Sequence, residues 1–126
     1  MRRLIALTLV AATSLTALPA QAEQVVFRCY FDWVCDPNTK CDHAGEDIRF
    51  RVDLETNSVE RIGGNTLSQF ELLLGDRAIT VLERPISGGT ATTTLMLDGG
   101  DAVHSENLIT GRDLTARQYL GECTAF

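Results

Sequence analysis

The fold is decided by residues 25–33, which read VVFRCYFDW. Apolar and polar residues alternate along this stretch with a period of two, the period of a β-strand that has one buried face. The side chains expected on the buried face are Val25, Phe27, Cys29, Phe31 and Trp33. The stretch therefore predicts a half-buried strand at the start of the domain.

The rest of the chain continues this pattern in short segments separated by glycine, asparagine and aspartate, and residues 98–101 (DGGD) are a strong hairpin signal. A helical face over residues 67–74 is the alternative to a strand there, and residues 114–120 are expected to begin as one short helical turn. The expected strands span residues 25–33, 48–54, 59–62, 69–74, 78–83, 90–97 and 102–109, with a closing strand that carries Cys123. About seven to eight short strands predict an all-β fold, a small antiparallel β-barrel or sandwich.

Residues 1–22 are typical of an export signal, because two arginines precede an apolar run that ends in the cleavage site AQA at residues 20–22. The run is interrupted by threonine and serine and is shorter than the roughly 20 apolar residues that span a bilayer. A lipid anchor would need a cysteine at the cleavage point, where Glu23 stands. We expect a periplasmic or secreted protein without a membrane span, with a single β domain over residues 23–126.

The chain is acidic. Its 11 basic and 17 acidic residues give a net charge of −6, and removal of the two arginines in the leader changes this to −8. An acidic surface without clusters of lysine and arginine repels phosphate backbones, so nucleic-acid binding is not expected. A basic protein is the expected partner of a monomeric domain, and an acidic surface that serves only solubility is the alternative.

Four cysteines predict two disulfides in an exported protein. Cys29 and Cys35 are separated by extended strand, which spans about 20 Å and exceeds the roughly 7 Å between the Cα atoms of bonded cysteines. Cys35 and Cys41 flank the turn-forming sequence DPNTK, which can bring them together. This favours one disulfide between Cys35 and Cys41 and a second between Cys29 and Cys123, which would join the first strand to the last.

The competing hypothesis for some of these residues is a metal site, because Cys35, Cys41 and His43 lie close together in the sequence. Thiolate and imidazole ligands suit zinc or copper. The spacing C-x5-C-x-H is not that of a zinc finger, and exported thiols usually oxidise. We therefore expect no metal or other cofactor, and we expect His43 to lie on an exposed loop.

Candidate catalytic residues are limited to the run His104, Ser105 and Glu106. Adjacent residues of a strand point to opposite faces, so this run cannot form a hydrolytic relay by itself. His104 shares a face with Ala102 and Glu106, and we expect that face to lie toward solvent. No residue is assigned a catalytic role, and the domain is not expected to be an enzyme.

The sequences FRC at residues 27–29 and GEC at residues 121–123 resemble the entry and closing strands of small exported proteins of Gram-negative bacteria, most of them uncharacterised. The layout is also similar to that of the periplasmic inhibitors of c-type lysozyme, which are small barrels with a disulfide between the chain ends. That resemblance implies a binding or inhibitory module with a contact loop at Ser87, Gly88, Gly89 and Thr90. The alternatives are a metal-binding envelope protein that uses Cys35, Cys41 and His43, and a structural interaction protein.

Overall fold

The computed structural model describes residues 23–38, 40–64 and 68–125, and the expected leader, residues 1–22, lies outside them. The described residues form eight β-strands and no helix. The strands are β1 (Gln24–Cys35), β2 (Cys41–Asp53), β3 (Ser58–Arg61), β4 (Gln69–Leu74), β5 (Ala78–Arg84), β6 (Gly89–Met96), β7 (Asp101–Thr110) and β8 (Asp113–Ala125). The expected all-β fold is confirmed.

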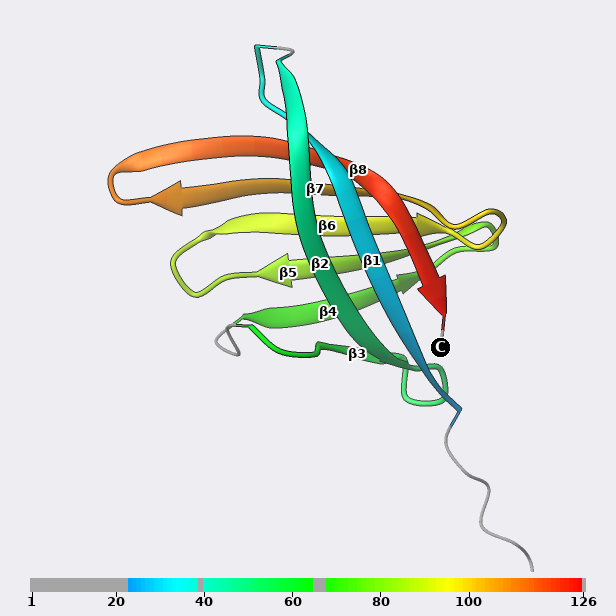
Figure 1. The fold of residues 1–126 in the computed structure, drawn as a ribbon. Helices are drawn as coiled ribbons and strands as arrows, with labels where there is room; N and C mark the ends of the chain where they lie inside the picture. The colour runs from blue at the N-terminus through cyan, green and yellow to red at the C-terminus, as the bar shows by residue number, and fades with distance from the viewer. Residues whose placement is uncertain (1–22, 39, 65–67, 126) are drawn as a thin grey trace, which may run out of the picture.

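All eight strands belong to one antiparallel sheet with the order β3-β2-β1-β8-β7-β6-β5-β4. The first strand pairs with the last, so the sheet curls round until its two edge strands, β3 and β4, lie near each other (Figure 1). The result is a nearly closed barrel in which most strand edges are paired. Of the two expected architectures, barrel and sandwich, the structure is the barrel.

An apolar core occupies the inside of the barrel. Its largest fully buried side chains, Phe31 and Phe50, come from β1 and β2. Burial of such a side chain contributes roughly 1.5–3 kcal/mol. The other core residues are Cys29, Ile48, Val52, Leu72, Ile79, Val81, Leu95, Ala102 and Cys123. The disulfide between Cys29 and Cys123 lies in this core and joins strands whose cysteines are 94 residues apart.

The two ends of β1 and β2 that meet at the second disulfide extend beyond the rest of the barrel as a hairpin, which we call the arm (Figure 1). Cys35 and Cys41 are register partners and are bonded to each other. The carboxylate of Asp36 accepts hydrogen bonds from the backbone nitrogens of Asn38 and Lys40, at 2.9 and 3.2 Å, and orders the turn. Both disulfides join the cysteines that the sequence favoured, and two disulfides are typical of an oxidising compartment.

Two sequence expectations about this region were wrong. β2 begins at Cys41 rather than at residue 48, so His43 lies on a strand and not on a loop. The register also shifts between Phe31 and Trp33, which marks a β-bulge at Asp32. A bulge adds one residue and changes the face of those that follow. Trp33 is therefore 40% exposed on the outside of the barrel, instead of sharing the buried face of Phe31.

The expected helical turn at the start of residues 114–120 was also wrong. β8 begins at Asp113 and pairs with β7 from Thr110 onward, so these residues are a strand over their whole length. Pairing along the full length of a neighbouring strand outweighs the weak local preference for a turn. Residues 69–74 form β4, as expected, and residue 67 lies outside the described residues.

Candidate functional site

A pocket of about 230 Å3 lies at one end of the barrel, beside the β5–β6 and β7–β8 turns. Figure 1 shows these two turns at the same end, on the left of the view. The residues that line the pocket include Arg61, Glu83, Ser87, Ala91, His104 and Glu106. Ligand sites often occupy the mouths of β-barrels, and titratable groups in a hollow mark a candidate site.

The pocket exists because a small residue stands between two large acidic ones. Glu83 is the register partner of Ala91, and Ala91 is the register partner of Glu106, so the three side chains form one row across β5, β6 and β7. Neighbouring strands are about 4.8 Å apart, which places the two carboxylate-bearing strands on the order of 10 Å from each other. The methyl group of Ala91 fills little of that gap, and a hollow flanked by carboxylates is left.

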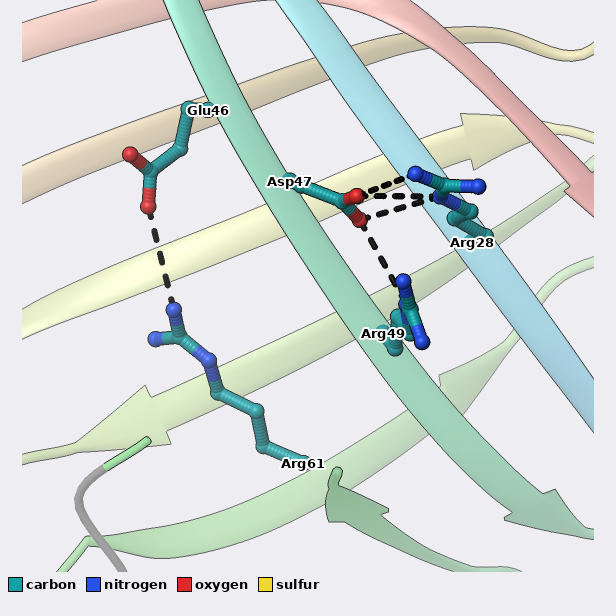
Figure 2. A network of polar contacts seen from close by, with 5 residues as sticks. All are labelled: Arg28, Glu46, Asp47, Arg49 and Arg61. Atoms are coloured by element: carbon teal, nitrogen blue, oxygen red, sulfur yellow. Dashed lines mark hydrogen bonds and ion pairs between the residues drawn. The ribbon is translucent and has the colours of Figure 1, made fainter. Parts of the chain in front are cut away.

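Arg61 connects this row to the opposite side of the barrel. Its guanidinium lies 3.7 Å from a carboxylate oxygen of Glu83 on β5 and 3.8 Å from one of Glu46 on β2, the second contact being drawn in Figure 2. Arg61 belongs to the edge strand β3, so its ion pair with Glu83 crosses the gap between the two edges of the sheet and reaches β5, next to the edge strand β4. The ion pair with Glu46 joins β3 to its neighbour β2. The side chains of Arg61 and Glu83 are 25% and 14% exposed, so this connection is partly shielded from water.

His104 lies inside the barrel, and the expectation that its face is turned toward solvent was wrong. It is 4% exposed, and its ring lies 5.8 Å from that of Phe31. Its Nδ1 is 2.7 Å from the hydroxyl of Thr93, and its Nε2 is 3.6 Å from a carboxylate oxygen of Glu106. The tautomer with a proton on Nε2 satisfies both contacts, since Nδ1 then accepts from the hydroxyl.

Glu106 is kept ionised by its neighbours. The polar contact with the His104 ring lowers the pKa of Glu106 from its ordinary value, with smaller contributions from the Tyr119 hydroxyl, 3.4 Å away, and from the charge of Arg117. Partial burial acts in the opposite direction and does not outweigh them. A carboxylate has about four acceptor positions, so Glu106 retains acceptor capacity toward the pocket.

The order hydroxyl, imidazole, carboxylate in Thr93, His104 and Glu106 is the order of groups in a hydrolytic relay. The nucleophile of such a relay must reach a substrate carbonyl. Thr93 is 2% exposed on the inner face of β6, so its hydroxyl is out of reach of a substrate in this structure. Ser105 lies on the other face of β7, where its hydroxyl accepts a hydrogen bond from the side chain of Gln118. Its hydroxyl is therefore directed away from His104 and Glu106. Thr93, His104 and Glu106 thus form a fixed group of polar contacts on the inner face of the barrel.

The two most exposed large apolar side chains of the described chain, Ile86 and Leu114, adjoin residues that line the pocket, and we call them the apolar rim. Ile86 is 82% exposed beside Ser87, and Leu114 is 72% exposed and is the register partner of Ile109, which lines the pocket. Exposed apolar side chains grouped at one place are characteristic of an interaction site. The barrel end therefore combines an apolar rim with a charged hollow.

Only part of the contact loop that the lysozyme-inhibitor resemblance implied lies at the pocket. Ser87 lines the pocket, and the backbone nitrogen of Gly88 donates to the carbonyl of Pro85 at 3.1 Å, which makes the turn tight. Gly89 and Thr90 already belong to β6. A Cβ at residue 89 would lie 2.1 Å from the carbonyl oxygen of Asn107, and its φ of +82° favours glycine. These glycines serve the close approach of β6 and β7.

The residues of the alternative metal site are arranged differently from what that hypothesis needs. Cys35 and Cys41 are bonded to each other and offer no thiolate, and His43 stacks on Trp33 with ring centroids 4.2 Å apart. Within the described residues, no group of three or more potential ligands is placed to hold a metal ion. The described residues also contain no helix with the length and apolar character needed to cross a bilayer.

Sequence reasoning missed most of the pocket. Glu83 continues the alternation of the buried Ile79 and Val81 along β5, and this signal could have placed its side chain inside the barrel. The contributions of Arg61 and Ala91 depend on which strands are neighbours, which no local pattern gives. Comparison with family models, with curated proteins and with solved structures finds no match to this chain.

Proposed function

We propose that the protein is an exported, non-catalytic binding module whose barrel-end pocket accepts a cationic side chain of a basic partner protein. The observation that carries the proposal is the row Glu83, Ala91 and Glu106, in which two inward-facing carboxylates flank a hollow beneath an apolar rim. Glu83 has a partner in Arg61 and Glu106 has one in His104, and a carboxylate with one such partner still has acceptor positions for a ligand. Here the row lies at the open end, where a partner can reach it.

The chemistry of the pocket suits a lysine or arginine. An ammonium or guanidinium group between the two carboxylates would form charge-assisted hydrogen bonds, roughly twice as strong as neutral ones. Ile86 and Leu114 would lose water against the apolar surface that surrounds that side chain. The net charge, −6 for the whole chain and −8 after removal of the leader, would also speed encounter with a basic partner.

A binding module is favoured over a carrier of small apolar molecules because packed core side chains occupy the inside of the barrel. It is favoured over a hydrolase because the hydroxyl of Thr93 is buried beside His104. Inhibition of c-type lysozyme is the form of this function that the resemblance in layout implies. In that form, Ser87 and the rim beside it would meet the enzyme.

The test measures binding of a c-type lysozyme to the purified protein by calorimetry, together with lysozyme activity. Ala91→Leu fills the hollow without a change in charge, and Glu106→Gln removes one carboxylate while keeping its shape. Glu55→Gln is the control, because this substitution makes the same charge change in the β2–β3 turn, away from the pocket. We expect each pocket variant to weaken binding at least tenfold, and the control to change it less than twofold.

Two results would contradict the proposal for this partner. One is the absence of binding to lysozyme at a large molar excess. The other is an equal response of the pocket variants and the control. If the protein binds lysozyme but does not inhibit it, the docking function stands and only its inhibitory form is excluded.

A further inference from the structure

A second surface, on the outer face of the barrel and away from the barrel-end pocket, has the features of a docking groove. Two adjoining hollows of about 510 and 480 Å3 share Asp101, Leu120 and Gly121. The second hollow is lined by Met96 and Val103, and its lining is predominantly apolar. We call these two hollows together the outer groove.

The floor of the outer groove, formed by Leu120, Val103 and Thr94, is the middle of an uncharged row of side chains that crosses the sheet. Register pairs connect Trp33 with Leu120, Leu120 with Val103, and Val103 with Thr94, from β1 through β8 and β7 to β6. The row ends on β5, where the hydroxyls of Thr94 and Thr80 are 2.9 Å apart. In a chain with 22% charged residues, an uncharged row over five strands of an outer face is a candidate contact surface.

One side of this floor is bordered by carboxylates. Asp32, Asp101 and Glu122 all line the first hollow, together with Tyr30. None of the three has an ion pair or a side-chain hydrogen bond with another described residue. Arg28 also lines the first hollow, and its guanidinium forms an ion pair with Asp47 at 2.5 Å, a contact drawn in Figure 2. The border is therefore acidic and uncompensated.

The arrangement carries a cost in the free protein. Asp101 and Glu122 are direct register partners on β7 and β8, and like charges placed directly opposite each other destabilise a sheet. A cation beside the pair would remove this repulsion. Glu122 is also the register partner of Tyr30, so an aromatic ring and two carboxylates share one cross-strand row next to the apolar floor.

We propose that the outer groove docks a basic segment of a protein in which cationic and apolar side chains are adjacent. The apolar side chains would cover Leu120 and Val103, and the cationic ones would lie between Asp101 and Glu122. Charge complementarity selects this occupant, because the acidic border repels an acidic peptide and a neutral apolar peptide would leave the carboxylate pair uncompensated. This surface is independent of the barrel-end pocket and goes beyond the function proposed for that pocket.

The experiment uses the purified protein and three synthetic peptides of equal length. One is composed of lysine and leucine, one of lysine and serine, and one of glutamate and leucine. We expect the lysine–leucine peptide to bind, the lysine–serine peptide to bind at least fivefold more weakly, and the glutamate–leucine peptide not to bind. Binding should weaken as salt is added, since the contacts are solvent-exposed.

Two variants with the same charge change separate this site from a general attraction of opposite charges. Glu122→Gln should weaken binding of the lysine–leucine peptide at least fivefold, because one carboxylate is lost. It should raise Tm by about 3 °C, because it removes the repulsion from Asp101. Glu55→Gln, in the β2–β3 turn, should change neither quantity. Opposite effects on binding and on stability are not expected of a variant that merely damages the fold.

The proposal is overturned if Glu122→Gln and Glu55→Gln bind the peptide equally, or if Glu122→Gln lowers Tm. It is also overturned if the peptide shifts amide resonances only at the barrel-end pocket. Ala91→Leu, which fills that pocket, should leave the affinity for the peptide unchanged. A negative result for the pocket variants with lysozyme would therefore not contradict peptide docking at the outer groove. A negative result for the outer groove would likewise not contradict the function proposed for the pocket.

Discussion

The two disulfides should differ strongly in what they contribute to stability. The bond between Cys29 and Cys123 closes a loop with a sequence separation of 94 residues, whereas the bond between Cys35 and Cys41 closes one of only 6. On the chain-entropy model, these loops correspond to about 4.7 and about 2.2 kcal/mol at 25 °C. Cys29 and Cys123 are also buried in the core, so loss of their sulfurs leaves a void that adds roughly 1–2 kcal/mol.

The perturbation is the replacement of each pair by alanine. The double variant Cys29→Ala/Cys123→Ala should lose about 6 kcal/mol in the free energy of unfolding, and Cys35→Ala/Cys41→Ala about 2 kcal/mol. Small domains have roughly 5–15 kcal/mol in total. The first variant should therefore be close to unfolding at 37 °C, while the second keeps its barrel.

The assay is urea denaturation at pH 7, followed both by far-UV circular dichroism and by the fluorescence of Trp33, the single tryptophan. Trp33 stacks on His43 in the arm, so its signal also shows whether the arm remains ordered when the nearby disulfide is absent. A loss in Cys35→Ala/Cys41→Ala equal to or larger than that in Cys29→Ala/Cys123→Ala would refute the argument from loop length and burial.

Two further predictions concern the packing of β8 against β1 and the charge of the pocket. Gly121→Ala should destabilise the barrel by about 2–4 kcal/mol, because its Cβ would lie 2.0 Å from the carbonyl oxygen of Tyr30; Gly45→Ala, whose Cβ meets only the Tyr30 hydroxyl at 3.7 Å, should be nearly neutral in the same urea assay. Because the polar contact with His104 lowers the folded-state pKa of Glu106, Glu106 adds stability above its unfolded pKa and loses it as the pH falls through the lowered value. The stability difference between the wild type and Glu106→Gln should therefore be larger at pH 7 than at pH 3, and a difference that grows toward acid would contradict this sign.

Most of the strands could be predicted from the sequence, because alternating apolar and polar residues indicate a strand with one buried face. The sequence was insufficient where a strand lacks apolar residues. Residues 41–47 (CDHAGED) have no buried face of their own, and they are a strand because they pair with β1 and because the disulfide at Cys41 fixes one end. The bulge at Asp32 was missed for a related reason, since an extra residue in one strand becomes visible only against its neighbours.

The candidate site was harder to predict than the fold. Alternation placed His104 and Glu106 on one face, but it could not say which face is inside, because polar residues normally indicate the solvent side. In this barrel the inside is apolar near Phe31 and charged at the end where Glu83 pairs with Arg61 and Glu106 lies beside His104. Only the pairing of distant strands shows that these polar faces converge.

The two proposed surfaces differ in how the protein accommodates their charge, and this difference bears on what they do. At the barrel end, Glu83 and Glu106 have partners in Arg61 and His104, and no described buried side-chain nitrogen or oxygen lacks a hydrogen-bond partner. Such a network can be kept for structure alone, so the argument for recognition there rests on the hollow at Ala91 and on the exposed rim. In the outer groove, Asp101 and Glu122 face each other, and neither forms an ion pair with another described residue. A repulsion that one amide substitution would remove has no structural benefit, and it is explained when a basic partner neutralises it.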